Sequence, residues 1–249
     1  MITSKLLAEA EGLSHGFSDR AEGESTAPYA SLNLAYHVGD DAAVVDANHA
    51  LLAGQLGYAP ERLVHMRQIH SDRIVHCTPE MGFHSRPECD ALMTDIAGQP
   101  LMVMVADCTP VLLYDPRRRA VAAVHAGRAG ALKNIVGKTV AAMHDAYGSD
   151  PADLLAVLGP SIGSCCYEIG PEVAQEVQAA GCEGALSRRD GRTYLDVNAI
   201  LEKQLEAAGL TAGHIDLPGS CTACRTDRFF SYRAEGGTTG RQAGIIMIK

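Results

Sequence analysis

The amino-acid sequence predicts an α+β fold in a single domain that covers residues 1–249. Short runs rich in valine and leucine predict strands, whereas amphipathic stretches with capping residues predict helices. The two kinds of segment do not alternate regularly, which disfavours a doubly wound α/β sheet. The chain has no internal repeat, low-complexity tract or linker-like segment, and 47% of its residues are hydrophobic. A chain of this size and composition can bury one large core.

Three apolar runs between residues 101 and 127 predict the centre of the fold. Leu101–Ala106 and Pro110–Tyr114 have the length and the Val/Leu content of buried strands. Residues 116–119, a proline followed by three arginines, predict an exposed turn. Ala120–Val124 then predicts the return strand of a hairpin.

The register of this hairpin places two reactive side chains together. A turn at residues 116–119 sets Asp115 opposite Ala120, so the numbers of paired residues sum to about 235. Cys108 and His125 then lie at the same end of neighbouring strands, with their Cα atoms roughly 5–8 Å apart. A thiol beside an imidazole indicates a functional site. The structural alternative is a buried cysteine and a hydrogen-bonded histidine.

The first predicted helix covers residues 42–56. Asp40 or Asp41 is its N-cap, and Gly57 ends it. We expect the helix to bury the apolar residues Val44, Val45, Leu51, Leu52 and Leu56.

The other elements are predicted from length, alternation and capping residues. Residues 131–147 predict one continuous helix. Pro171 occupies the favoured first turn of another helix, and Asp196 caps a further one that runs to about Ala208. Additional strands are predicted at Arg62–Met66, Arg73–Cys77, Leu154–Leu158, Ile215–Leu217 and Ala243–Ile248.

Charge and composition exclude several classes of protein. With 30 acidic and 21 basic residues the chain has a net charge of −9, which disfavours nucleic acid as a partner. No segment reaches the roughly 18 apolar residues of a membrane span. The N-terminal residues lack the apolar core of a signal peptide. The eight cysteines are scattered along the chain, so we expect reduced thiols in a cytoplasmic protein.

His70, Cys108 and His125 form a candidate zinc site. Zinc binds imidazole and thiolate, and a catalytic zinc site uses three protein ligands and an open fourth position. A cysteine nucleophile is an alternative, with Cys108 attacking, His125 as the base, and Asp107 or Asp90 orienting the imidazole. His70 discriminates between the two hypotheses, because the nucleophile pair does not need a second histidine.

Four other cysteines suggest a structural metal site that the sequence disfavours. Cys221-x-x-Cys224 together with Cys165-Cys166 provides four thiols. However, adjacent cysteines seldom bind one ion together, and a thioredoxin-like motif would need a βαβ context that is absent.

Seven motifs, in this order, resemble one bacterial family. They are PYASLNL, RQIHSD, ADCTPVLL, VHAG, GPSIGSCCYEIG, FFSYR and TGRQAG. Together they are similar to the YfiH/YlmD-type proteins, which carry the labels laccase-domain protein, polyphenol oxidase, purine nucleoside phosphorylase and peptidoglycan editing factor. The resemblance extends from about Gly16 to Ile248.

The resemblance implies an α+β fold with α/β/β/α layers and a zinc ion bound by His70, Cys108 and His125. It also implies phosphorolysis of adenosine, inosine, guanosine and methylthioadenosine, with phosphate as co-substrate, and deamination of adenosine. Arg241, Arg233 or Arg67 would hold the phosphate, because arginine pairs bidentately with such anions.

The predicted site contains further residues. Asp107 is expected to carry a proton or to hold a neighbouring site residue in place, and Asn33, Gln68, Ser71 and Arg241 are expected to bind substrate. The chain departs from the usual family run HAGWRG, because Arg128 and Ala129 replace the tryptophan and the arginine.

The same residues allow three rival functions. The first is a multicopper polyphenol oxidase, which needs about ten histidines, largely in HxH pairs. The chain has ten histidines and no HxH, although copper can occupy a single His/Cys/His site. The second is a peptidoglycan-precursor editing hydrolase. The third is a non-enzymatic protein whose metal has a fourth ligand, His65 or His76.

Overall fold

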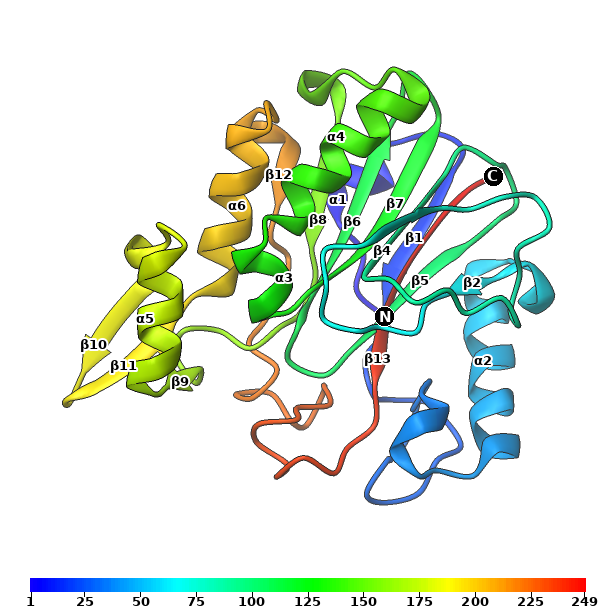
Figure 1. Ribbon diagram of the computed structural model, residues 1–249. Coiled ribbons are helices and arrows are strands. Elements are labelled where there is room, and N and C mark those ends of the chain that lie inside the picture. The colour runs from blue at the N-terminus through cyan, green and yellow to red at the C-terminus, as the bar shows by residue number, and fades with distance from the viewer.

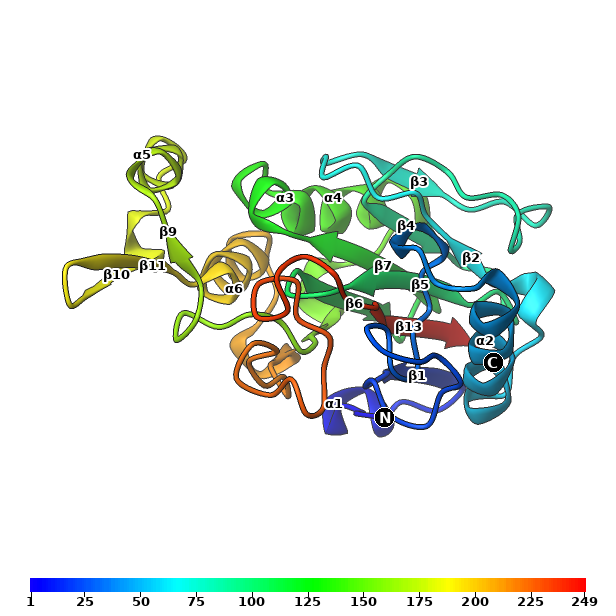
Figure 2. The same ribbon diagram turned by 90° about the horizontal axis from the view of Figure 1, so that it is seen from below.

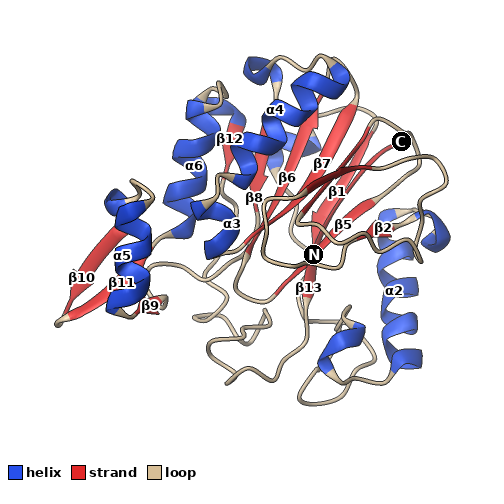
Figure 3. Ribbon diagram, in the orientation of Figure 1, coloured by secondary structure: helices blue, strands red, loops and turns tan.

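The computed structural model describes residues 1–249, which form six α-helices and thirteen β-strands (Figure 3). The helices are α1 (Lys5–Ala8), α2 (Ala42–Leu56), α3 (Arg128–Leu132), α4 (Ile135–Tyr147), α5 (Pro171–Ala179) and α6 (Val197–Ala207). The strands are β1 (Leu13–Phe17), β2 (Val64–His65), β3 (Ile74–His76), β4 (Ala91–Thr94), β5 (Leu101–Val105), β6 (Thr109–Asp115), β7 (Ala120–Ala126), β8 (Leu155–Leu158), β9 (Glu168–Ile169), β10 (Leu186–Arg189), β11 (Arg192–Leu195), β12 (Ile215–Asp216) and β13 (Gln242–Ile248). None of the helices is both long enough and apolar enough to cross a membrane.

Two β-sheets stack face to face, and helices cover the outer face of each sheet (Figure 1, Figure 2). The six-stranded sheet has the order β12-β8-β6-β7-β4-β3, and the four-stranded sheet has the order β1-β13-β5-β2. Both sheets mix parallel and antiparallel pairs. Helices α3, α4 and α6 pack on the first sheet, and α2 packs on the second. The α+β fold with α/β/β/α layers is confirmed.

The hairpin of β6 and β7 lies at the centre of the six-stranded sheet and has the predicted register. Asp115 pairs with Ala120, and Pro110 pairs with His125. Strand β4 pairs with the other side of β7, and the backbone N–H of His125 donates to the carbonyl oxygen of Asp90 at 2.7 Å. The residues that precede β4 and β6 therefore meet the end of β7 at one edge of the sheet.

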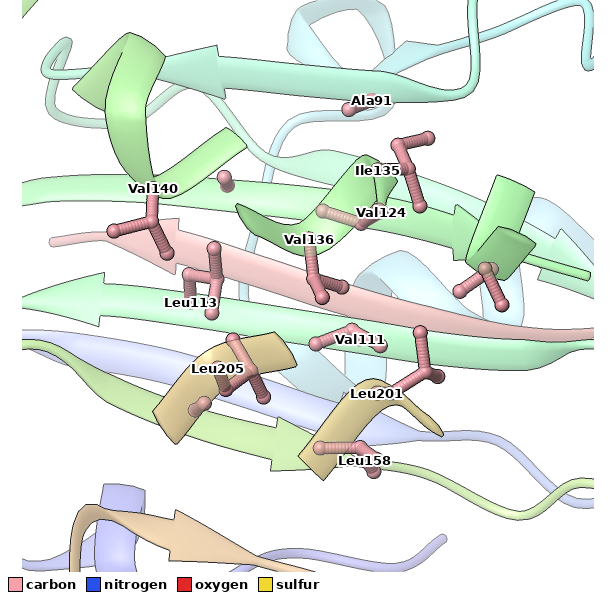
Figure 4. Packing of buried hydrophobic residues seen from close by; sticks show 14 of the residues in the cluster. Ala91, Val111, Leu113, Val124, Ile135, Val136, Val140, Leu158, Leu201 and Leu205 are labelled. Atoms are coloured by element: carbon pink, nitrogen blue, oxygen red, sulfur yellow. The ribbon is translucent and has the colours of Figure 1, made fainter. Parts of the chain in front are cut away.

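Alternate side chains of β6 enter two different cores, which explains why this run is apolar on both faces. Val111 and Leu113 pack against α4 and α6, as Figure 4 shows. Leu112 and Tyr114 lie between the two sheets instead. Burial of each such side chain stabilises the fold by about 1.5–3 kcal/mol, so the hairpin is a firm base for the residues at its end.

The prediction of one helix over residues 131–147 was wrong, because two helices share this stretch. Helix α3 begins earlier, at Arg128, and the break falls before α4. Asn134 adopts a left-handed φ of 59° and its side chain accepts a hydrogen bond from the N–H of Gly137. Asparagine tolerates this conformation and caps helices well, so it both ends the first helix and begins the second.

Helix α2 has the predicted bounds, but one predicted core residue was wrong. Leu51 is exposed, whereas Asn48 and His49 are fully buried. Asn48 donates to the carbonyl oxygen of Asn33 at 2.8 Å, and His49 Nε2 lies 2.9 Å from the carbonyl oxygen of Leu34. Asn48 and His49 therefore lie on the buried face of the helix, where they bind the loop that precedes it.

A small unit projects from the layered core (Figure 1, Figure 2). It consists of α5 and a three-stranded sheet in the order β10-β11-β9. Neither this sheet nor the short helix α1 and strand β1 was predicted, because these segments lack a clear apolar period.

Candidate metal centre and adjoining cavity

Three potential metal ligands meet at one end of the central hairpin. His125 lies near the end of β7, Cys108 immediately precedes β6, and His70 lies in the loop between β2 and β3. The ligand atoms of the three side chains all lie within 4.8 Å of one another. The rings of His70 and His125 are nearly perpendicular, with their centroids 4.9 Å apart. The structure thus brings together the three residues predicted as a metal centre.

Asp90 holds two of these ligands in position. Its Oδ1 lies 2.8 Å from His125 Nδ1 and accepts a hydrogen bond from the backbone N–H of His70 at 3.0 Å. Its Oδ2 accepts hydrogen bonds from the N–H and the hydroxyl of Ser71 at 2.6 and 2.7 Å. His70 has a φ of 56°, which is uncommon outside glycine, and these bonds stabilise that conformation. Because Asp90 engages Nδ1, the other ring nitrogen of His125 faces the Cys108 thiol.

The electrostatics of the centre favour a thiolate. Burial would raise the pKa of the Cys108 thiol, but the charges and hydrogen bonds of His125 and His70 lower that pKa to about 6. Burial opposes the protonation of His125, but the charge of Cys108 and the bond to Asp90 raise the pKa of His125 to about 9. Burial would also raise the pKa of Asp90, yet its bonds with His125 and Ser71 lower it to about 2. Metals bind the thiolate form of cysteine and the neutral form of histidine, so a cation bound here would replace the proton that His125 holds beside the thiolate.

Gly127 permits the close packing of the centre. A Cβ atom at this position would lie 2.8 Å from the Cys108 sulfur and 3.5 Å from Cδ2 of His70. Any larger residue would therefore displace the sulfur, which explains why glycine follows the His-Ala pair of the VHAG motif.

The donor set fits zinc in an open site. Two imidazoles and one thiolate are ligands that zinc uses, and three protein ligands leave one position free. His70, Cys108 and His125 all line a cavity of about 910 Å³, so the free position would face this cavity. His65 and His76 lie outside the group of ligand atoms. The structure therefore does not favour a closed, four-ligand centre.

The cavity wall carries positive charge although the chain has a net charge of −9. Asp107 is the one acidic residue among the lining residues. Two of the lining arginines have carboxylate partners: Arg67 pairs with Glu88, and Arg128 pairs with Glu176. The lining arginines are Arg67, Arg86, Arg128, Arg233 and Arg241.

Arg233 and Arg241 keep their charge free of a carboxylate. Arg233 donates to the carbonyl oxygen of Glu168 at 2.8 Å. Arg241 donates to the carbonyl oxygens of residues 239–240 at 2.8 and 2.9 Å. These backbone contacts orient the two guanidinium groups without neutralising them, so both can pair with an anion in the cavity.

Of the four residues expected to bind substrate, two line the cavity. These are Gln68 and Arg241. Asn33 is fully buried away from the cavity, and its Oδ1 accepts a hydrogen bond from the N–H of Arg241 at 2.9 Å. Ser71 is likewise not a lining residue and holds Asp90. Asn33 and Ser71 therefore lie behind the wall of the cavity, where they bind Arg241 and Asp90.

Asp107 connects the centre to the long loop between β12 and β13. Its Oδ1 accepts hydrogen bonds from the hydroxyls of Thr222 and Ser231 at 2.6 and 2.8 Å. Its Oδ2 accepts a hydrogen bond from the backbone N–H of Arg233 at 2.7 Å. Of the two carboxylates considered as partners of His125, the structure therefore selects Asp90.

Several lining residues received no role from the sequence, among them Ile162, Tyr167 and Tyr232. Ile162 and Tyr167 belong to the motif GPSIGSCCYEIG, and Tyr232 belongs to FFSYR. Membership in these motifs was the available signal, since the residue types themselves carry no specific chemistry.

A second group of potential ligands lies nearer the surface. The sulfur atoms of Cys165, Cys166, Cys221 and Cys224 all lie within 4.8 Å of one another. The sequence disfavoured joint use of adjacent cysteines, yet the structure brings all four together.

These features define a class of α+β protein with a mixed nitrogen–sulfur centre at the wall of a cavity. A family model described as "Multi-copper polyphenol oxidoreductase laccase" matches residues 14–249, and the chain belongs to this family. The family implies metal binding, for which His70, Cys108 and His125 form a possible site.

Named relatives and solved structures agree with this assignment. A protein of Corynebacterium glutamicum named purine nucleoside phosphorylase is 42% identical over 235 residues, which cover 93% of each chain. The crystal structure of Bacillus licheniformis hypothetical protein YfiH matches with a TM-score of 0.92 and 32% identity, covering 97% of this chain and 94% of that chain. The crystal structure of YlmD from Geobacillus stearothermophilus matches with a TM-score of 0.88 and 32% identity, covering 96% and 93%. The YfiH/YlmD resemblance is confirmed.

Proposed function

We propose that the chain is a zinc-dependent purine nucleoside phosphorylase that also deaminates adenosine. The observation that carries this proposal is a single cavity in which the His70, Cys108 and His125 centre accompanies Arg233 and Arg241. The name purine nucleoside phosphorylase on relatives from Corynebacterium glutamicum and Streptomyces coelicolor supports the substrate class. The proposed substrates are adenosine, inosine, guanosine and methylthioadenosine.

The size of the cavity suits a nucleoside together with phosphate. Ligand pockets commonly enclose about 300–1,000 Å³, and this cavity encloses about 910 Å³. Its wall combines aromatic and aliphatic side chains, such as Tyr167, Tyr232 and Ile162, with a few polar groups. Such a wall suits a flat base joined to a polar sugar.

Arg233 and Arg241 would bind the phosphate. In phosphorolysis a phosphate oxygen forms a bond to C1′ of the ribose while the bond from C1′ to the purine nitrogen breaks. The electrons of the broken bond leave with the purine, which takes up a proton. The two guanidinium groups would hold the attacking anion and stabilise its charge in the cavity.

A buried histidine, His65, lies in the wall of the cavity. Its side chain is 2% exposed, both ring nitrogens lack a hydrogen-bond partner, and the residue lines the cavity. Burial lowers the pKa of His65 to about 4, so the ring is neutral at physiological pH.

His70, Cys108 and His125 would hold the zinc ion. When bound, zinc supplies Lewis-acid chemistry and makes a nucleophile available at neutral pH. In the deamination of adenosine, a water oxygen forms a bond to C6 of the base and ammonia leaves. Asp107, the one carboxylate of the wall, is the proposed proton carrier for this step, and its three hydrogen bonds would fix its position.

Two rival hypotheses explain the arrangement of these residues less well. A Cys108–His125 nucleophile pair would leave His70 without a role, although its ligand nitrogen lies within 4.8 Å of the other two ligand atoms. A four-copper oxidase needs about ten histidine ligands, and the two groups of potential ligands contain only two of the ten histidines in the chain. Copper in place of zinc at the one His/Cys/His centre would remain a side reaction.

Product analysis with adenosine tests the proposal. Adenine and ribose 1-phosphate are expected only when phosphate is present. Deamination is expected with or without phosphate, and its product is inosine, together with hypoxanthine when phosphate is present. Arg241→Met should raise the KM for phosphate about 10- to 100-fold, the loss of one charged hydrogen-bonding group. Arg188→Met, on exposed β10 and outside the set of lining residues, is the matched control and should leave this KM unchanged. Absence of any turnover with zinc in the protein would contradict the proposal.

A further inference from the structure

Four cysteine sulfurs form a compact group outside the cavity. All of them lie within 4.8 Å of one another, and Cys224 Sγ lies 3.5 Å from Cys165 Sγ and 3.3 Å from Cys166 Sγ. In a tetrahedral site with zinc–sulfur distances of about 2.3 Å, the sulfurs lie about 3.8 Å apart. The group therefore has the size of a four-thiolate metal site. None of the cysteines in the chain forms a disulfide.

Two loops supply the sulfurs in pairs. Cys165 and Cys166 lie between β8 and β9, and Cys221 and Cys224 lie between β12 and β13. A parallel bridge joins Ser161 to Cys221, outside the regular strands. The loops thus meet through backbone pairing as well as through the thiols.

The surrounding backbone suits a negatively charged cluster. The N–H of Gly163 donates to the sulfur of Cys221 at 3.3 Å. Arg189 donates to the carbonyl oxygens of Ser164 and Cys165 at 2.9 and 3.0 Å, so a positive charge lies at the backbone of the loop that carries two of the thiols. Four thiolates around a divalent ion carry a net charge of −2, and both contacts would stabilise that charge.

We infer that Cys165, Cys166, Cys221 and Cys224 bind a structural zinc ion. Four cysteines in tetrahedral reach are a donor set that zinc uses for closed, non-catalytic sites. Soft thiolate ligands select zinc over magnesium or calcium. The inference does not depend on the nucleoside chemistry proposed for the cavity.

The ion would stabilise the loop that forms one wall of the cavity. The loop that carries Cys221 and Cys224 continues to Tyr232 and Arg233, which line the cavity. Within the same loop, Thr222 donates to Asp107, and its N–H donates to the carbonyl oxygen of Ser161 at 3.0 Å. Loss of the zinc should therefore loosen Arg233 while leaving the His/Cys/His centre intact.

Metal counting on the full chain, purified in the presence of reductant and zinc, tests the inference. We expect two zinc ions per chain in the native protein and one each in Cys224→Ser, Cys166→Ser and His70→Ala. Cys182→Ser removes a thiol that belongs to neither group and should retain two ions. Native protein with one zinc that disappears in His70→Ala, or a Cys224→Ser variant with two zinc ions, would overturn the inference. Iron in place of zinc would also overturn it.

A spectroscopic measurement keeps the test valid if the cysteine variants fail to fold. Metal-free His70→Ala protein is titrated with Co²⁺, which should bind in one equivalent and show the charge-transfer absorption of a four-thiolate tetrahedral site. Added zinc should abolish that absorption. Absence of the thiolate–cobalt absorption, or a loss of two mass units that reports a disulfide in the freshly reduced protein, would refute the site. A native protein that binds two zinc ions but leaves nucleosides unchanged would contradict the proposed function and support the zinc inference.

Discussion

The two groups of potential ligands occupy contrasting parts of the molecule. His125 and Cys108 lie at the ends of paired strands, and His125 is 3% exposed. The four-cysteine group lies on two loops, with Cys165 and Cys224 exposed. The first group has three potential ligands, all of which line the cavity, whereas the second has four potential ligands, none of which lines it. We expect this difference to separate a reactive metal centre, which needs rigid ligands and a free coordination position, from a structural metal site, which needs neither.

Replacement of Cys108 should separate the two centres most sharply. Cys108→Ala is expected to lose one zinc ion and to lower phosphorolysis at least about 1,000-fold, because a metal contributes several kcal/mol to stabilising the transition state. The melting temperature should fall by less than about 4 °C, since the core of a chain this long does not depend on this thiol. Metal counting, product analysis and thermal unfolding provide the three measurements.

Replacement of a cysteine in the four-cysteine group should have the opposite effect. Cys224→Ser should keep the reactive centre and change the KM for phosphate more than kcat, because it acts through Arg233. Full activity in Cys108→Ala would refute both the zinc role and the nucleophile role of that thiol.

Replacement of Asp90 tests whether this carboxylate orients the histidine ligands of the His70, Cys108 and His125 centre. Asp90→Asn should weaken zinc binding about 10- to 100-fold, the usual effect of losing a carboxylate that orients a histidine ligand. Competition with a zinc-binding dye gives the affinity. Asp95→Asn, on the exposed segment after β4, is the matched control and should bind zinc normally. Equal affinity in both variants would show that the strands alone orient His125.

Gly127 tests how closely the centre is packed. Gly127→Ala places a methyl group 2.8 Å from the Cys108 sulfur, and overpacking of this kind costs about 1–3 kcal/mol. We expect a roughly 10-fold loss of zinc affinity, a smaller effect than at Asp90. Gly54→Ala, in α2 with open space around it, should leave zinc binding unchanged and serves as the control. Unchanged affinity in Gly127→Ala would show that the sulfur can move freely.

Local patterns were sufficient to predict the central hairpin and the two side chains that meet at its end. The turn at residues 116–119 and the two apolar runs determine the register, and the register places Cys108 beside His125. The bounds of α2 followed from Asp41 and Gly57 for the same reason, because a cap and a left-handed glycine act within one turn of chain.

The sequence patterns could not predict contacts between distant segments of the chain. Asp90 reaches His125 only because β4 pairs with β7, and no local signal shows that pairing. The four cysteines meet because two irregular loops pair at Ser161, and loops follow no apolar period. That residues 1–249 unfold as one domain stays a prediction, which a single cooperative transition would support.

The most direct test of the account measures phosphorolysis of adenosine by protein that has been stripped of metal and then reloaded with zinc. We expect no adenine from the stripped protein, and phosphate-dependent release of adenine with ribose 1-phosphate after reloading. Cys108→Ala treated in the same way should stay inactive. Full activity in the stripped protein, or none in the reloaded protein, would contradict the account.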